Sequence, residues 1–221
     1  MTSAANLDVV DLLCKEADAE RAVAMAAYMR DQFPFLGIPS PRLKALVRSA
    51  AFPKPTEASL RAQVMELWEL PEREFQYVAL TQLREHANLC GPGFIDVTRH
   101  LVVTKSWWDT VDELAAHVVG VLVQNHPQLV ATMDHWIDDE NMWLARTAIL
   151  HQNRYKTLTD SERLFRYCEK QMAHKDFFIR KAIGWALREY AYTDPEAVRA
   201  FVRANEGTLS GLSKREALKN L

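Results

Sequence analysis

Hydrophobic and polar positions along this chain follow the helical period almost throughout. Apolar residues recur three and four positions apart in successive blocks, whereas the alternation typical of strands is nearly absent. No Asn-Gly or Asp-Gly hairpin turn occurs, and most of the 7 glycines fall between the periodic blocks. The pattern therefore predicts an all-α protein.

Capping residues and prolines mark where several of these helices begin. Ser40-Pro41 and Asp194-Pro195 each place a capping side chain before a proline that suits the first helical position. Residues 159–162 (TDSE) and 213–216 (SKRE) both fit the capping box, in which a hydroxyl and an acid satisfy free amides reciprocally. We expect helices to begin at all four places.

Small residues recur inside the helical blocks at a nearly constant spacing. The alanines that show this repeat are separated by steps of 34, 36, 33, 34 and 35 residues, namely Ala45, Ala79, Ala115, Ala148, Ala182 and Ala217. A step of this length accommodates two helices and two turns, and a small residue at fixed phase lets neighbouring helices approach closely. The spacing predicts an α-α superhelix (solenoid) of about six helical pairs, forming a single domain over residues 1–221. One helix of each pair would line a concave binding groove.

Charge is distributed unevenly, although the net charge is only −2. Residues 1–150 contain 13 Lys/Arg against 20 Asp/Glu, whereas residues 151–221 contain 14 Lys/Arg against 9 Asp/Glu. A basic C-terminal part is compatible with binding to a polyanion. A solvated helix surface with scattered charge explains the same count, and counting leaves both interpretations open.

Several functional classes lack support in the sequence. No apolar run approaches the length of about 18 residues that a membrane span needs, and residues 1–8 lack the pattern of a signal peptide. Nucleotide-binding and hydrolase signatures are absent, and neither the histidines nor the three distant cysteines have metal-ligand spacing. We expect a cytoplasmic protein with reduced thiols, no metal, no cofactor and no membrane partner.

Tryptophans and acids are the most informative candidates for chemistry. Trp108 and Asp112 stand four residues apart, so a helix would place an aromatic ring and a carboxylate side by side. That pair suits a flat cationic ligand, although Asp112 in a capping or bridging role explains the spacing equally well. We expect the other central tryptophans to fill gaps between helices, namely Trp68, Trp107, Trp136 and Trp143.

Six segments, in order along nearly the whole chain, resemble the AlkD-type DNA alkylation repair glycosylases. They are residues 28–38 (YMRDQFPFLGI), 67–76 (LWELPEREFQ), 103–112 (VTKSWWDTVD), 141–149 (NMWLARTAI), 176–190 (DFFIRKAIGWALREY) and 212–217 (LSKREA). The resemblance implies a superhelix of HEAT-like repeats that holds duplex DNA in its concave groove. It also implies hydrolysis of the N-glycosidic bond of cationic alkylpurines such as 3-methyladenine and 7-methylguanine, without full extrusion of the base.

The resemblance also assigns the site. The catalytic acid corresponds to Asp112, the two tryptophans to Trp108 and Trp185, and the supporting arginine to Arg146. Arg154 stands where a relative usually has lysine. The residues that we expect to contact DNA are Tyr28, Arg154, Arg180, Lys181, Arg188, Lys214 and Arg215.

The chemistry of these residue types suits the implied reaction. As the glycosidic bond stretches, positive charge moves to the sugar, where a carboxylate at Asp112 would stabilise it and orient the attacking water. Arg146 would hold a phosphate or the substrate's position. Because charge rather than base shape would select the substrate, we predict tolerance for bulky cationic adducts and poor activity on neutral lesions.

Three interpretations fit a helical array with these residues. The first is an alkylpurine glycosylase, the second a non-catalytic HEAT-like scaffold for duplex or damaged DNA, and the third a protein-binding solenoid. Retention of Asp112 with both tryptophans favours the first, and we expect a monomer because the groove must stay open. Relative to the repeat alanines, Arg146 falls on a different phase from Asp112 and Trp185. Either the register shifts in that repeat, or Arg146 enters the groove from a helix end.

Overall fold

The computed structural model describes residues 4–50 and 52–221, and these form α-helices with short 3-10 and π segments and no strand. The predicted all-α class is confirmed. No helix in these ranges has the length and hydropathy that crossing a membrane requires. Residues 1–3, part of the segment that we expect to carry no signal peptide, lie outside the described ranges.

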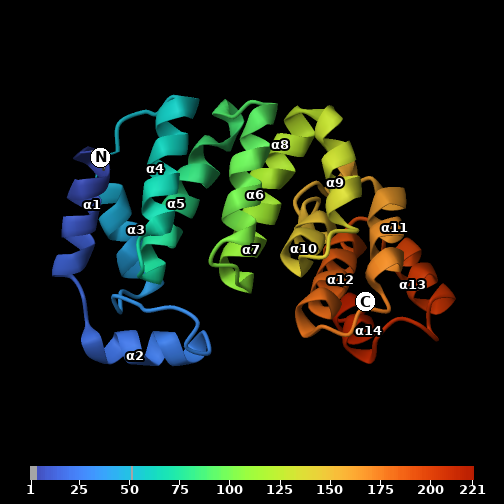
Figure 1. Cartoon of the computed structure of the whole chain (residues 1–221). Coiled ribbons are helices and arrows are strands. Elements are labelled where there is room, and N and C mark those ends of the chain that lie inside the picture. The colour runs from blue at the N-terminus through green and yellow to red at the C-terminus, as the bar shows by residue number, and fades with distance from the viewer. Residues whose placement is uncertain (1–3, 51) are drawn as a thin grey trace. The chain divides into compact units, whose positions relative to one another are not determined.

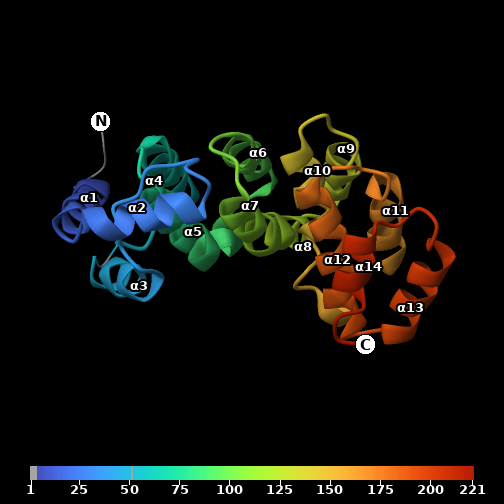
Figure 2. The same cartoon turned by 90° about the horizontal axis from the view of Figure 1, so that it is seen from below.

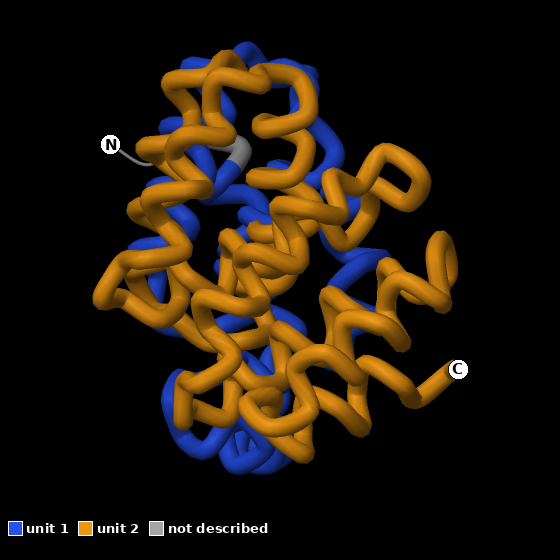
Figure 3. Tube along the Cα trace, turned by 90° about the vertical axis from the view of Figure 1, so that its right-hand side faces the viewer, with its two compact units in different colours: residues 1–89 blue, residues 90–221 orange. Residues whose placement is uncertain are grey.

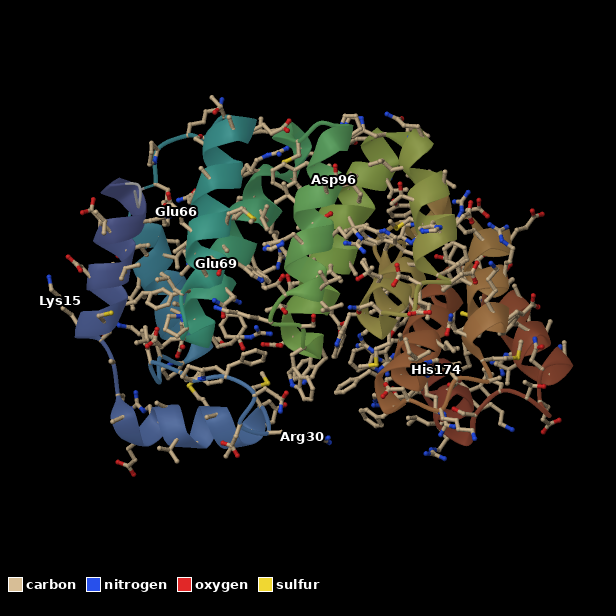
Figure 4. The ribbon with its side chains drawn as sticks, in the orientation of Figure 1. Lys15, Arg30, Glu66, Glu69, Asp96 and His174 are labelled. Carbon is tan, nitrogen blue, oxygen red and sulfur yellow. The ribbon has the colours of Figure 1, made fainter. Side chains whose placement is uncertain are left out.

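The chain divides into two compact units, residues 1–89 and residues 90–221 (Figure 3). Unit 1 contains α1 (Ala4–Lys15), α2 (Ala19–Tyr28), α3 (Ser40–Ser49), α4 (Glu57–Glu69), α5 (Arg73–His86) and the 3-10 turn η1 (Ala87–Leu89). Within it α1 packs on α3 and α4 on α5 (Figure 1). Glu66 lies on the α1 side of α4 (Figure 4), and its carboxylate accepts a 2.7 Å hydrogen bond from Asn6. The single domain over residues 1–221 stays a prediction.

A buried carboxylate holds the loop that enters α3. Glu74 of α5 is fully buried, and its two oxygens accept hydrogen bonds of 2.9–3.0 Å from the backbone amides of Leu36, Gly37 and Ile38. Gly37 has a φ of 90°, and a Cβ there would lie 2.1 Å from the carbonyl of Asp18. The loop therefore requires glycine at this position and an anion behind it.

Unit 2 holds the remaining helical pairs. Its elements are η2 (Pro92–Phe94), α6 (Ile95–Val103), α7 (Trp108–Leu114), the π segment η3 (Ala115–Val119), α8 (Gly120–Asn125), η4 (Pro127–Leu129), α9 (Val130–Trp136), α10 (Met142–Leu150), η5 (Lys156–Leu158), α11 (Ser161–Gln171), α12 (Phe177–Ala191), α13 (Pro195–Ala204) and α14 (Gly211–Ala217). Helix α10 packs on α6, α7, α9 and α12, and α12 packs on α11, α13 and most extensively on α14. Helices α12 and α14 lie side by side (Figure 2).

The alanine repeat corresponds to real helical pairs in both units. Each marker alanine lies in the second helix of a pair, with α7, η3 and α8 together forming one such second helix. Five of the six are fully buried, as close helix packing requires. The prediction is wrong for Ala45, which is exposed, because the adjacent Leu46 faces the core of unit 1 instead.

Two of the predicted helix starts need correction by one residue. Asp194 caps α13 as expected, accepting from the amide of Ala197 at 2.9 Å. Helix α11 is capped by Asp160, not by the threonine before it, since the carboxylate reaches the amide of Arg163. Ser40 does not cap α3 but is its first residue, and the preceding Pro39 offers no side-chain cap.

The capping box expected at residues 213–216 is wrong. Ser210 caps α14 through the amide of Ser213, so Ser213 lies inside the helix and is buried. Its hydroxyl donates instead to the carbonyl of Arg180 in α12, at 2.8 Å. Glu216 is consequently released from a capping role, and it contributes to the site described next.

Candidate active site

Helix α7 presents Trp108 and Asp112 one turn apart, as the sequence spacing predicted. Both side chains are partly buried. The π segment η3 follows directly and widens the helical turn, a feature that often accompanies functional sites. Gly120 is the first residue after this segment, and a Cβ there would lie 2.4 Å from the carbonyl of His151. Glycine thus lets the α7–α8 segment approach the end of α10 closely.

Arg146 of α10 reaches across to Asp112 and forms a bidentate ion pair. Its Nε and one terminal nitrogen each donate to a different carboxylate oxygen of Asp112, both at 2.7 Å. The other terminal nitrogen donates to the carbonyl of Phe178 at the start of α12. Only 1% of the arginine side chain is exposed, against 22% of the aspartate side chain. The pair therefore joins three helices, and the Asp112 side chain remains partly exposed whereas that of Arg146 is buried.

The structure shows how Arg146 enters the site, which its position relative to the repeat alanines left open. Arg146 lies in the middle of α10 and is buried between α7 and α12, so it does not enter from a helix end. Its guanidinium is held by Asp112 and Phe178, and a contact of Arg146 with a phosphate or with the substrate stays a prediction. The arginine positions the carboxylate rather than facing solvent.

Two opposing effects act on Asp112. Burial is the larger effect and raises the pKa of the Asp112 carboxyl above its usual range, although the charge and hydrogen bonds of Arg146 act in the opposite direction. Because both oxygens accept hydrogen bonds from the guanidinium, the geometry is that of a carboxylate. The site thus contains a desolvated anion held in a fixed plane.

Trp185 of α12 lies next to this pair. The guanidinium carbon of Arg146 is 5.3 Å from the centroid of the Trp185 ring, and Nζ of Lys181 is 5.0 Å from it. The indole N–H donates to Glu216 at 3.0 Å. Trp185 and Asp112, which are 73 positions apart in the chain, are therefore connected through one arginine.

Glu216 is the site residue that sequence reasoning missed. Besides Trp185 it accepts from Lys181 at 2.8 Å and from Arg188 at 3.0 Å, and 17% of its side chain is exposed. The hydrogen bond from Lys181 is the main reason that the pKa of Glu216 is lowered. The sequence did contain a signal for such an acid. Lys181, Trp185 and Arg188 share one face of α12, and two partly buried cations on one face require a nearby carboxylate.

The other predicted DNA contacts are distributed as follows. Lys181, Arg188 and Arg180 lie on α12, and Nε of Arg180 donates to the carbonyl of His174. Lys214 and Arg215 lie on α14, and Arg154 is exposed in the turn after α10. Tyr28 is 74% exposed at the end of α2 and belongs to unit 1, whereas all the others belong to unit 2.

The remaining tryptophans behave as gap fillers, with one partial exception. Trp68, Trp136 and Trp143 are buried, as predicted. Trp107 is only partly buried, and its ring packs 6.0 Å from that of Trp143 and 5.0 Å from that of Phe178. This aromatic cluster supports the α12 turn whose carbonyl holds Arg146.

Groups that could bind a metal are lacking in the described ranges. No group of three or more His, Cys, Asp or Glu side chains is arranged there so that it could hold a metal ion. The three cysteines are free thiols, of which Cys90 and Cys168 are buried. The chemistry available at this site is that of two carboxylates, two indoles and several cations.

Comparison with known proteins places the chain in a family. A family model for the DNA alkylation repair enzyme matches residues 9–221, and this chain belongs to that family. It is also similar to a solved structure from Enterococcus faecalis that is described as a predicted DNA alkylation repair enzyme, with 32% identity and a TM-score of 0.83. That match covers 93% of this chain and 96% of the other. No curated protein is significantly similar to this chain.

Proposed function

We propose that this protein is a monofunctional DNA glycosylase that hydrolyses the N-glycosidic bond of cationic alkylpurines in duplex DNA. The observation that carries the proposal is the Asp112–Arg146 pair, a buried but partly accessible carboxylate that is held in place by two hydrogen bonds of 2.7 Å. Membership of a family of DNA alkylation repair enzymes supports the same class of substrate.

The carboxylate acts on charge that develops during bond cleavage. An alkylated purine already carries a positive charge and leaves readily, so the reaction needs stabilisation of the sugar cation more than a strong acid. Asp112 supplies the counter-charge and orients a water for attack, in the way that carboxylates serve glycoside hydrolysis. Arg146 opposes the effect of burial on the pKa of Asp112 and holds the carboxylate in one plane, so no reorganisation is needed as charge develops.

The two tryptophans form the aromatic part of the site. Trp108 lies one turn from Asp112 on α7, and Trp185 is linked to Asp112 through Arg146. Their electron-rich faces would contact the cationic nucleotide, with each such contact contributing about 0.5–2 kcal/mol. Recognition through charge rather than a closed pocket supports action without full base flipping, and activity on 3-methyladenine, 7-methylguanine and bulkier cationic adducts.

The surrounding charges suit a DNA backbone. Arg146, Lys181 and Arg188 provide three positive charges against two negative charges from Asp112 and Glu216, which leaves an excess of one positive charge in this network. We propose that Lys181 and Arg188, together with Arg180, Lys214, Arg215 and the exposed Arg154 and Tyr28, contact duplex DNA. Changing Arg154 or Arg215 to alanine should weaken binding to any duplex and reduce the salt dependence by about one phosphate contact each.

The test is release of methylated purines from dimethyl-sulfate-treated duplex, comparing the wild type with Asp112→Asn and Trp108→Ala. We expect the wild type to release bases and Asp112→Asn to be at least about tenfold slower, equivalent to about 1.4 kcal/mol of barrier. Because Asp112→Asn leaves Arg146 without its counter-charge, thermal unfolding is measured in parallel. Trp108→Ala leaves the ion pair intact and tests the same site without that risk.

Each outcome separates the candidate functions. No release by a folded wild type that still binds duplex DNA tightly would favour the non-catalytic scaffold. Equal release by the wild type and both variants would retain the enzyme and discard this site as its centre.

A further inference from the structure

Glu216 of α14 connects three side chains on one face of α12. One carboxylate oxygen accepts from Lys181 at 2.8 Å, and the other accepts from the Trp185 indole and from Arg188, both at 3.0 Å. We propose that Glu216 is a positioning residue of the site, which fixes the orientation of the Trp185 ring and restrains the two cations beside it. This inference rests on the proposed function and assigns a role to a residue outside the expected set.

The position of Glu216 depends on close packing of two helices. A Cβ on Gly184 would lie 2.4 Å from Cβ of Glu216 and 3.0 Å from the carbonyl of Ser213, so α14 approaches α12 where α12 has no side chain. The buried hydroxyl of Ser213 then donates to the carbonyl of Arg180 and sets the register. A glutamate held in this way cannot swing freely, and its orientation is transmitted to its partners.

The ring of Trp185 transmits that orientation to the reactive carboxylate. Its indole N–H is bound by Glu216, and its ring contacts the guanidinium of Arg146 at 5.3 Å. Arg146 in turn holds both oxygens of Asp112. If the indole loses its acceptor, the ring can rotate, and both the aromatic wall and the surroundings of Arg146 change.

Glu216 also restrains the positive charge available to DNA. Its lowered pKa keeps it ionised at neutral pH, where it offsets one of the two charges of Lys181 and Arg188. Removing this carboxylate should therefore strengthen attraction to phosphates while it loosens Trp185. The two effects have opposite signs, whereas a residue with a purely structural role would weaken binding and catalysis together.

The experiment compares Glu216→Ala and Glu216→Gln with the wild type by three measurements: the single-turnover rate of base release at saturating enzyme, affinity for unmodified duplex, and the indole N–H resonance of Trp185 in ¹H–¹⁵N spectra. We expect Glu216→Ala to shift the resonance, lower the saturated rate by about tenfold and tighten duplex binding by about two- to threefold at low salt. Glutamine retains an acceptor, so it should tighten binding similarly while keeping the resonance nearly in place and losing less rate.

The matched control is Asp134→Asn. Asp134 is also in unit 2 and accepts from Arg166 and Tyr167, each at 2.8 Å, so this variant removes one charge and disturbs a more exposed hydrogen-bond network whose partners lie on α11. We expect its saturated rate and the Trp185 resonance to match the wild type. A fall in rate as large as that of Glu216→Ala would attribute the effect to net charge and overturn the proposal.

The proposal and the enzyme assignment can fail separately. An unshifted Trp185 resonance in Glu216→Ala, or an unchanged saturated rate in an active wild-type background, overturns the role of Glu216. If the wild type releases no base, the glycosylase assignment fails, and the resonance and duplex affinity still judge whether Glu216 holds Trp185 and restrains the cations. Should Glu216→Ala not fold, Glu216→Gln decides by its duplex affinity, since unchanged binding contradicts the charge restraint.

Discussion

Arg146 donates one 2.7 Å hydrogen bond to each carboxylate oxygen of Asp112, although the two residues lie 34 positions apart in the chain. That separation is one repeat, so the pair joins equivalent helices of neighbouring helical pairs. Burying two charges is costly, and well-packed apolar residues at such positions are often equally stabilising. A function that needs a carboxylate in one fixed orientation gives this pair a reason that stability alone does not.

Arg146→Lys keeps the charge and removes the fork that holds both oxygens of Asp112. We expect the free energy of unfolding to fall by about 1–3 kcal/mol, because buried acceptors lose a partner, and base release to slow at least tenfold. Denaturant unfolding and single-turnover kinetics measure the two effects. The exposed pair of Arg166 with Asp134 supplies the control, since Arg166→Lys should change stability by less than about 1 kcal/mol. Equal effects at the two sites would contradict a special role for the fork.

Gly184→Ala tests the close approach of α12 and α14. Helix propensity alone predicts stabilisation by about 1 kcal/mol, but the new methyl group would lie 2.4 Å from Cβ of Glu216. We expect net destabilisation by about 1–3 kcal/mol, as for other overpacked contacts, measured as a lower denaturant midpoint. Gly207, in the turn after α13, is the steric control and should tolerate alanine, because a Cβ there would meet no atom within 4 Å. A more stable Gly184→Ala variant would rule out the close packing.

Ionised Glu216 should stabilise the fold, and this stabilisation should be lost at acid pH. Its pKa in the folded state is lowered, chiefly by the hydrogen bond from Lys181, relative to about 4.3 for an unfolded glutamate. The stabilisation is therefore fully present above about pH 4.3 and is lost as the pH falls through the lower folded-state pKa. The difference in unfolding free energy between the wild type and Glu216→Gln should therefore become smaller as the pH is lowered from about 6 to below about 4.3. A constant difference across that range would show that the charge of Glu216 does not stabilise the fold.

His151 should make the free energy of unfolding depend on pH in a second, higher range. It is fully buried, Nδ1 lies 2.7 Å from the carbonyl of Ala148, and burial lowers its pKa to about 4. Relative to about 6.5 in the unfolded chain, its contribution is complete above about pH 6.5 and is lost as the pH falls toward 4. Stability of His151→Leu should vary less with pH over this window than that of the wild type. If NMR shows that the His151 ring titrates with a pKa of about 6.5, as in an unfolded chain, this prediction is contradicted.

Local pattern accounted for the helices and for part of the site. Periodicity and caps predicted the all-α class, and five of the six marker alanines are buried in the second helices of their pairs. The one-turn spacing of Trp108 and Asp112 on α7 also followed from sequence, because neighbours on a helix are set by its own geometry. Ala45 was wrong because Leu46 faces the core instead, and the cap at Ser213 was wrong because the helix begins earlier, where Ser210 caps it.

The sequence by itself determined which residue types are present, which of them share a helix face, and the resemblance that assigned Asp112, Trp108, Trp185 and Arg146. Only the tertiary structure decided that Arg146 is buried against Asp112 and that Glu216 holds Trp185. Helical propensity, capping and periodicity act over a few residues, whereas these contacts span 34 and 31 positions. They depend on how α7, α10, α12 and α14 pack, and that packing is set by the π segment η3, by Gly120 and by Gly184.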